Sequence, residues 1–485
     1  MEGQKGNKVL NSLFWSFFER VGNQGVSLII SIVLARLVLP TEYGIIAAAQ
    51  IFIQVATAFV SGGFGNALIQ KKDADNKDCS TMFVFNMVFS ISLYGIIFAT
   101  APLLVTVLND SYDYTLLIKV VRALGFGIVL SSFNSFYRAL LSKKLQFKRI
   151  FSLTLCGTIT SAVVGIYMAY KGYGVWALVT QNLLNLFINS ILFVVTSKYR
   201  PQLYFSFTRF KPMFKFGVKL MISSLLITVY ADVASLAIGH EYDSSDLAYY
   251  QKGINFPKML VLNIITAINT ALFPIMSNME SLEEKRQMVR KFNRISAFVI
   301  TPMMFGFAAV ANSFVAIVLT EKWLPCVIFL QISCFNYAIQ PISMASLQFL
   351  KATGRATEYL VLDIIRKVVG IGLLVGAVLL NKGVWLIAVS ELVANFIAVF
   401  VNMYPGKKHI GYKISEQLKD VLPKFALSAV MFAAVIAVGN IEMALILKLM
   451  LQIVVGAGVY FVGAKLTRMR ELNELFDIGM KIIKK

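Results

Sequence analysis

Polar residues recur at helical spacing inside the first apolar stretch of the chain. Ser16, Arg20, Gln24, Ser27 and Ser31 follow one another at intervals of four, four, three and four residues. Residues three and four apart lie on the same face of an α-helix. A face with an arginine, an amide and hydroxyls suits an anionic polar ligand, because a guanidinium bonds phosphate oxygens through two parallel hydrogen bonds.

Three further apolar stretches carry stripes of this kind. Their polar members are Gln50, Gln54, Thr57 and Ser61 in one; Ser224, Thr228, Asp232 and Ser235 in the next; and Asn255, Asn263, Thr266 and Thr270 in the last, with Lys252 one turn away. A single Ser or Thr in an apolar helix usually bonds its own backbone or a neighbouring helix. Four stripes together predict a water-filled cavity.

The candidate site follows from these stripes. The predicted substrate-binding residues are Glu19, Arg20, Gln24, Arg36, Gln50, Gln54, Lys252, Asn255 and Asn263, and the predicted ion-coupling residues are Asp232 and Glu391. The charged residues are the strongest evidence for a functional site, because placing a charge at the centre of a bilayer costs about 2.5–3.5 kcal/mol. No catalytic residue and no metal site is predicted: the two histidines fall in predicted loops and the four cysteines have no ligand spacing.

Several charges have alternative roles. Arg20 could neutralise Glu19, and Asp232 could pair with Lys252. Lys252 and Arg36 lie toward the ends of their stretches, where a cation can also anchor a helix at the membrane interface. A structural charge network in the second half is a further alternative, with the members Asp363, Arg366 and Glu391.

The composition defines the elements that must position these residues. Of the 485 residues, 58% are hydrophobic and 15% are charged, against about 25% charged in soluble domains. Apolar stretches of 18 or more residues recur along the chain, and in lipid such stretches must be helices. The net charge of +21 resides in short loops, which indicates membrane topology rather than nucleic-acid binding.

Window hydropathy predicts an all-α polytopic membrane protein of about fourteen spans. They fall near 12–38, 42–68, 80–108, 115–141, 150–170, 174–197, 213–239, 246–276, 295–319, 324–349, 357–380, 383–404, 421–439 and 442–464. Loops rich in lysine and arginine, such as SKKLQFKR (142–149), alternate with loops such as HEYDSSD (240–246) that have almost none. The positive-inside rule therefore places both termini in the cytoplasm.

A repeated phrase divides the chain. GYGVWALV (172–179) returns as KGVWLIAV (382–389), and TEYGIIAAAQ and SDLAYYQKGI, near the second and eighth spans, also align. Two six-helix lobes, 1–200 and 201–412, are predicted, in the same orientation because six is even, with a substrate path at their interface. The repeated phrase itself predicts a tight turn at the glycine, followed by a tryptophan that anchors the helix at the membrane interface.

Two segments lie outside the repeat. Two additional spans occupy 413–466, and a cytoplasmic tail occupies 467–485. The tail places Leu472, Phe476, Met480 and Ile483 on one helical face, which predicts a basic amphipathic helix on the inner leaflet.

Three segments resemble a known family. VLARLVLPTEYGIIAAAQIFIQ…GFGNALIQKK (33–72), ALLSKKLQFKRI (139–150) and GYGVWALVTQ (172–181) are similar to Wzx-type polysaccharide transporters of the MOP superfamily, especially the subgroup for colanic and teichuronic acid repeat units. The likeness covers roughly residues 10–200. Members of that subgroup often carry an acidic residue before Gly-Phe-Gly, whereas this chain has Ser61 and Gly62.

The resemblance implies a fold and a function. The fold is a V of two six-helix lobes that opens alternately to either side, with spans one, two, seven and eight lining the portal. The implied activity is flipping of undecaprenyl-pyrophosphate-linked oligosaccharide across the bacterial plasma membrane, coupled to H⁺ or Na⁺ and without a cofactor. The implied partners are this lipid, the bilayer, a polysaccharide polymerase and glycosyltransferases, and not nucleic acid.

Other functions predict other residues. A multidrug and toxin extruder of the same superfamily, which exports organic cations, needs a cavity dominated by carboxylates and aromatics. A membrane polymerase or ligase needs a substantial outer loop, and no predicted outer loop exceeds about ten residues. A membrane scaffold needs no polar stripes.

Overall fold

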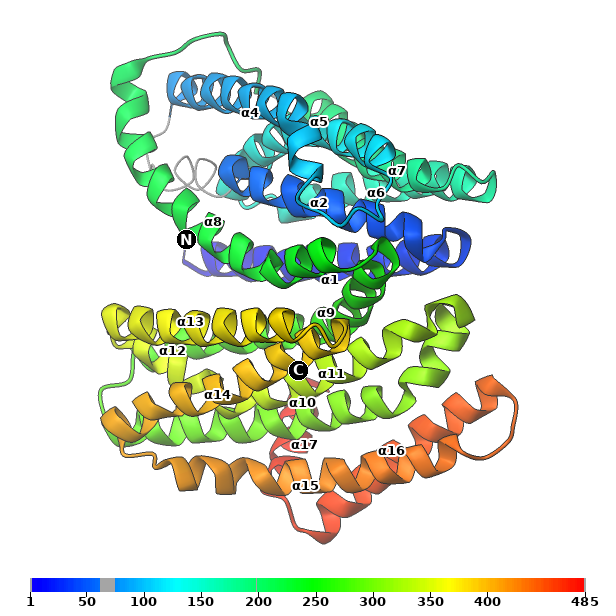
Figure 1. The fold of residues 1–485 in the computed structure, drawn as a ribbon. Helices are drawn as coiled ribbons and strands as arrows, with labels where there is room; N and C mark the ends of the chain where they lie inside the picture. The colour runs from blue at the N-terminus through cyan, green and yellow to red at the C-terminus, as the bar shows by residue number, and fades with distance from the viewer. Residues whose placement is uncertain (1, 62–74, 198, 484–485) are drawn as a thin grey trace. The chain divides into compact units, whose positions relative to one another are not determined.

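The computed structural model describes residues 2–61, 75–197 and 199–483, in which the regular structure is helical (Figure 1). Side chains are described except those of 2–14, 17, 267–271, 273–274, 356, 476–479 and 481–483. The chain divides into two compact units, 1–248 and 249–485. Gly62, Ala67 in the second predicted span, and the side chains of Thr270, Phe476 and Ile483 lie outside this description.

The first unit consists of seven described long helices. They are α1 (Glu2–Leu37), α2 (Pro40–Ser61), α4 (Asn76–Val105), α5 (Tyr114–Lys143), α6 (Phe147–Tyr170), α7 (Val175–Thr196) and α8 (Phe207–Glu241). The helices α1 and α7 pack on α6, α4 packs on α5, and α2 packs against both α5 and α8. Asp75 caps α4 in a reciprocal capping box with Asp78, which fixes where that helix begins.

The second unit starts within α9 (Ser244–Ser277). It continues through α10 (Leu282–Val318), a short 3₁₀ turn (Glu321–Cys326), α11 (Val327–Ile339), α12 (Met344–Ala352), α13 (Ala356–Leu380), α14 (Val384–Ile410), α15 (Ile414–Gly439), α16 (Leu445–Leu466) and α17 (Arg470–Ile483). The central helix is α10, which packs against α11, α15 and α16, while α13 packs on α14.

The predicted all-helical membrane fold is confirmed. Eleven segments among the described residues are long and apolar enough to cross a bilayer. The predicted spans 12–38, 246–276 and 357–380 also coincide with long helices, α1, α9 and α13. The chain is therefore a multi-pass helical membrane protein.

The tenth predicted span is not one helix. The stretch 324–349 is divided into α11 and α12 by a 3₁₀ turn, Gln340–Ile342. Pro341 lies in this turn, and proline lacks the N–H that would continue the α-helical bonding. Hydropathy did not detect the break, because Gln340 and Ser343 are isolated polar residues between long apolar stretches.

The two copies of the repeated phrase share a glycine with positive φ directly before a helix. Gly174 (φ +55°) directly precedes α7, and Gly383 (φ +104°) directly precedes α14. Positive φ values favour glycine, which has no Cβ. Trp176 and Trp385 are exposed in the first turn of the helix that follows. Each phrase is thus a glycine turn with an exposed tryptophan, as its sequence predicts.

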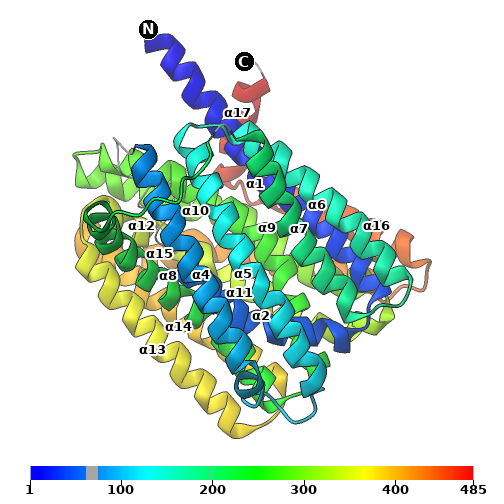
Figure 2. The same cartoon turned by 90° about the horizontal axis from the view of Figure 1, so that it is seen from above.

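Helix α8 belongs to the first unit and is curved. Its N-terminal part runs across the long axes of α1, α2 and α4, and the rest runs alongside them (Figures 1 and 2). Pro212 and Gly217 lie in the N-terminal part, and proline is a common cause of a bend in a helix. The two units therefore divide after residue 248, later in the chain than the predicted lobe boundary at 200. That boundary derives from the repeat and stays a prediction.

Candidate functional site

One face of α1 packs on α6 within the first unit. The Trp15 and Phe151 rings lie 6.3 Å apart between centroids, and Asn23 Nδ2 donates to Thr154 Oγ1 over 2.8 Å. A Cβ at Gly22 would lie 2.8 Å from a ring atom of Phe151, so glycine permits this approach. The packing fixes the rotation of α1 and therefore the direction of its other faces.

Glu19 lies beside this packed face and is paired. Its Oε1 accepts from Arg138 Nη2 of α5 at 2.6 Å. Glu19 is only 7% exposed, whereas the Arg138 side chain is 50% exposed. Among the side chains that the structure describes, Glu19 forms its ion pair with Arg138 and not with Arg20, which resolves one of the alternatives left by the sequence.

Arg20 lies on the side of α1 that is not packed on α6. The side chain is exposed, as is that of Ser27, and Gln24 is half-buried. Arg20 has no ion pair with any side chain that the structure describes. Because Arg138 already neutralises Glu19, the charge of Arg20 remains available to an anion.

The α2 stripe separates into amides and hydroxyls. Gln54 is exposed and Gln50 half-buried, so both amides can reach a ligand. The hydroxyl of Ser61 instead donates to the Thr57 carbonyl of the same helix at 2.8 Å. Arg36 is exposed in the last turn of α1.

The α8 stripe is less accessible than the α1 stripe. Ser224, Thr228 and Asp232 are half-buried, and Ser235 is buried. The structure therefore leaves Asp232 partly accessible as the predicted ion-coupling carboxylate of the first unit.

Lys252 lies in the interior of the second unit. It is 8% exposed, and its Nζ lies 5.6 Å from the centroid of the Trp323 ring, which is within the range of a cation–π contact. The next residue, Gly253, packs so closely that a Cβ would lie 2.6 Å from the Cβ of Phe329. Lys252 therefore contacts the unit's own core rather than an open surface.

The two asparagines of α9 differ. Asn255 is exposed. Asn263 is half-buried and donates to the Met259 carbonyl at 3.1 Å, and Thr266 donates to the Leu262 carbonyl at 2.7 Å. Of the α9 stripe, Asn255 is thus the side chain most open to a ligand.

The predicted charge network in the second unit is split. Asp363 pairs with Arg366 at 2.7 Å and with Lys367 at 3.1 Å, all on α13. Glu391 of α14 instead accepts from the hydroxyl of Tyr250 of α9 at 2.9 Å. Sequence reasoning missed Tyr250, because a tyrosine near a helix end usually indicates only an interface anchor.

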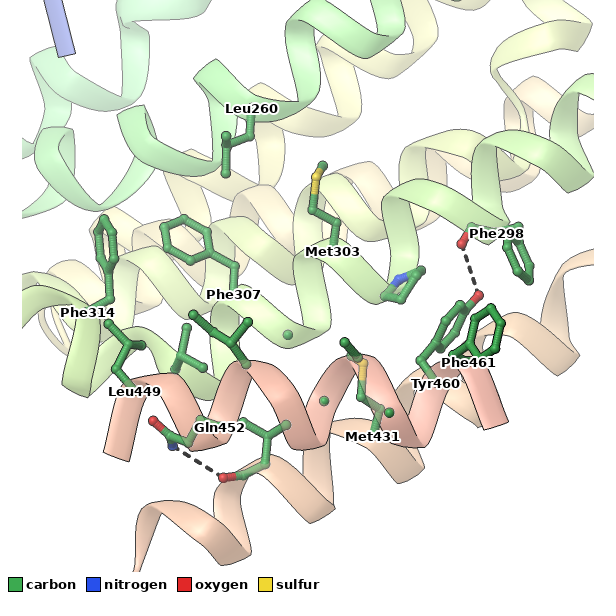
Figure 3. A pocket seen from close by; sticks show the side chains of 18 of the residues that line it. Leu260, Phe298, Met303, Phe307, Phe314, Met431, Leu449, Gln452, Tyr460 and Phe461 are labelled. Atoms are coloured by element: carbon green, nitrogen blue, oxygen red, sulfur yellow. Dashed lines mark hydrogen bonds between the residues drawn. The ribbon is translucent and has the colours of Figure 1, made fainter. Parts of the chain in front are cut away.

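An apolar pocket of about 900 Å³ lies in the second unit, between α10, α15 and α16 (Figure 3). Its walls include Met303, Phe307, Met431 and Phe461.

The polar side chains at the edge of this pocket already have hydrogen-bond partners. Gln452 Nε2 donates to the Val435 carbonyl over 3.3 Å, and the Tyr460 hydroxyl donates to the Phe298 carbonyl over 3.0 Å. Such a pocket suits a hydrocarbon chain rather than a sugar. Sequence reasoning did not find it, because its walls come from distant helices.

These features define a class: a polytopic helical membrane protein that has an exposed arginine, Arg20, on one face of α1 and an apolar pocket in its second unit. The described residues include no group of three or more potential metal ligands. Residues 33–328, more than half of the chain, match the model of a family described as polysaccharide biosynthesis protein. The chain belongs to this family.

Curated relatives agree with the family. The chain is 24% identical to the lipopolysaccharide biosynthesis protein WzxC of Escherichia coli K12, over 67% of this chain and 66% of that protein. It is 23% identical to the teichuronic acid biosynthesis protein TuaB of Bacillus subtilis 168, over 82% and 83%. It is 22% identical to the succinoglycan biosynthesis transport protein ExoT of Rhizobium meliloti 1021, over 79% and 78%.

Solved structures share the fold. The lipid II flippase MurJ, in an inward closed conformation, has a TM-score of 0.73 at 14% identity, over 94% of this chain and 97% of that one. An inward-facing MATE family multidrug transporter of the MOP superfamily has a TM-score of 0.61 at 16% identity, over 80% and 94%. The predicted MOP-type fold is confirmed.

Proposed function

We propose that this protein is a flippase for undecaprenyl-pyrophosphate-linked oligosaccharide repeat units, acting in the synthesis of a surface polysaccharide. It would move the polar headgroup from the cytoplasmic to the outer leaflet of the bacterial plasma membrane by alternating access, with both termini in the cytoplasm. Family membership and relatives named for polysaccharide biosynthesis and transport support this activity. It is a transport function and involves no catalytic residue.

The observation that carries the proposal is the charge balance on α1. Glu19 is neutralised by Arg138, while Arg20 is exposed and has no ion pair among the described side chains. A pyrophosphate is an anion, and a guanidinium binds its oxygens through two hydrogen bonds at once. A carrier of organic cations would need the opposite balance, so this face favours a flippase over a MATE-like multidrug antiporter.

The remaining candidate residues take complementary roles. We assign the sugar hydroxyls to the amides Gln24, Gln50, Gln54, Asn255 and Asn263, of which Gln54 and Asn255 are exposed. The isoprenoid chain stays in the lipid bilayer or enters the apolar pocket between α10, α15 and α16. Lys252 can reach a substrate only after its contact with Trp323 opens. Coupling to H⁺ or Na⁺ is assigned to Asp232 and Glu391.

Reconstituted protein tests both the function and the site. Proteoliposomes receive a fluorescent undecaprenyl-pyrophosphate oligosaccharide, and a membrane-impermeant quencher measures how much reaches the opposite leaflet. Arg20→Gln should slow translocation about tenfold or more, because a charged hydrogen bond contributes about 1.5–3 kcal/mol. Arg20→Lys should lose less. Arg355→Gln, which also removes an exposed arginine, is the matched control.

The outcomes separate function from site. Wild-type translocation no faster than in protein-free liposomes would exclude the flippase function. Normal translocation by Arg20→Gln would exclude only the assignment of Arg20. Uptake of an organic cation by the same liposomes, without movement of the lipid, would support the multidrug alternative.

A further inference from the structure

The N-terminal part of α8 has one face packed on the first unit. Phe210 and Met213 are buried in a cluster with Met82 of α4, and Phe85 packs against it. The Phe210 and Phe85 rings lie 4.6 Å apart between centroids. This packing holds the segment across the axes of the neighbouring helices (Figures 1 and 2).

An ion pair fixes the beginning of the segment. Arg209 Nη1 lies 2.7 Å from Asp75 and 3.1 Å from Asp78, the two residues of the α4 capping box. The arginine just before the exposed face is therefore already neutralised, and it orients the residues that follow.

Three lysines occupy the opposite face of this segment. Lys211, Lys215 and Lys219 are spaced four residues apart and are all exposed. Their directions on a helical wheel are opposite to those of Phe210 and Met213. None of the three has an ion pair with a side chain that the structure describes. The result is a row of three uncompensated positive charges along about 12 Å of helix, which we call the lysine row.

Exposed apolar side chains directly precede the lysine row in the chain. Leu203 is 97% exposed, and Phe205 and Phe207 are also exposed. A helical segment with lysines on one side and large apolar side chains next to them is typical of helices that lie in the membrane interface. There the apolar groups enter the acyl region and the ammonium groups reach the headgroups.

We propose that the lysine row binds the headgroups of anionic phospholipids in the adjacent leaflet, and so holds the N-terminal part of α8 in the plane of the membrane. Charge complementarity identifies an anion, and the exposed Leu203 and Phe207 identify a lipid, because a free phosphate would leave those side chains in water. The site is distinct from Arg20 and acts whatever the transported substrate is.

Lipid-dependent stability tests this site. Purified protein in neutral detergent receives phosphatidylglycerol or, in parallel, phosphatidylcholine, and both Tm and the number of bound lipids in native mass spectra are measured. Wild type should bind phosphatidylglycerol on the order of tenfold more tightly, and added salt should reduce that preference because the charges are exposed. The triple variant Lys211→Gln, Lys215→Gln, Lys219→Gln should lose most of the preference.

Matched variants control for charge and folding. Lys119→Gln, Lys171→Gln and Lys382→Gln together remove the same charge from exposed positions elsewhere and should behave like wild type. The triple Lys→Arg variant of the row keeps the charge and should retain the preference. A preference that persists in the Gln variant, or that is independent of salt in wild type, would overturn the proposal. So would inorganic pyrophosphate that abolishes lipid binding at low micromolar concentration, because the row would then be a phosphate site.

Discussion

At the scale of single residues, the two members of the Glu19–Arg138 ion pair differ in exposure: Glu19 is buried, whereas the Arg138 side chain is half exposed. Arg138→Gln should destabilise the first unit by about 3 kcal/mol, because it leaves a buried carboxylate without its partner. The freed carboxylate also lies one residue from Arg20 and would compete for its charge, so translocation should fall as well. Thermal unfolding in detergent and the quencher assay measure the two effects.

The reciprocal substitution provides the control. Glu19→Gln leaves Arg138, whose side chain is half exposed and can be solvated, so its cost should be below that of Arg138→Gln. The double variant should recover much of the stability lost in Arg138→Gln. A larger loss for Glu19→Gln than for Arg138→Gln would contradict this account of the pair.

The spacing of residues predicted their faces but not what covers each face. The interval between Arg20 and Gln24 correctly predicts a shared face of α1, and that face is not packed on α6. The same reasoning could not predict that Lys252 packs under Trp323, because the contact joins residues far apart in the chain. Nor could it identify Arg138 as the partner of Glu19. Local periodicity carries no information about tertiary partners.

At the scale of elements, the C-terminal helix α17 is fixed to the second unit by its first turn. Glu471 is 2% exposed and accepts from Arg294 of α10 at 2.5 Å and from Lys424 of α15 at 2.9 Å. Leu472 and Leu475 pack in a cluster with Phe298. The predicted amphipathic helix is present, but its first turns contact α10 and α15, and Met480 further along is exposed.

Removing this carboxylate should release α17. Glu471→Gln leaves Arg294 and Lys424 without the negative charge that they share, and should weaken docking by about 3 kcal/mol, or roughly 100-fold. Hydrogen exchange of the amides in 470–483 measures this opening. Glu474→Gln is the matched control on the same helix, because that residue is half-buried and lies 3.6 Å from Lys291; it should change exchange by less than about 1 kcal/mol.

The same carboxylate makes docking depend on pH. Burial raises the pKa of Glu471, but hydrogen bonds from Arg294 and Lys424 outweigh it and bring the pKa below its usual range. Its stabilisation is therefore complete above the unfolded pKa of about 4.3 and is lost as pH falls through the lower, folded value. The protection factors of the α17 amides, which are corrected for the intrinsic exchange rate at each pH, should stay high from pH 7 to about 5 and fall below about pH 4. Glu471→Gln should abolish this dependence; an unchanged profile in that variant would assign it to another group.

Element boundaries show where sequence reasoning succeeds and where it fails. Hydropathy placed a helix at each predicted span, because the bilayer imposes length and backbone bonding on all of them alike. It failed at Pro341, because hydropathy does not register the missing backbone N–H of a proline. It also could not predict that the N-terminal part of α8 runs across the neighbouring helices, since that direction depends on packing against α4.

At the scale of the whole molecule, the repeat predicts that its two copies share one orientation in the membrane. The glycine–tryptophan turns before α7 and α14 each have a glycine with positive φ directly before the helix. If each copy holds six helices, the turns lie on the same side of the bilayer; if the number were odd, they would lie on opposite sides. Orientation is therefore a direct test of the parallel repeat.

Four single cysteines distinguish these arrangements. Lys171→Cys and Lys382→Cys lie just before the two turns, and Lys144→Cys and Lys407→Cys lie near the opposite ends of α6 and α14; all four positions are exposed. The background is Cys156→Ser, because the other native cysteines are buried. In intact cells, a membrane-impermeant maleimide should label Cys at 171 and 382, and should label 144 and 407 only after permeabilisation. Labelling of 171 without 382 would require an inverted second copy, whereas labelling of 144 and 407 in intact cells would reverse the proposed orientation and leave the parallel repeat in place.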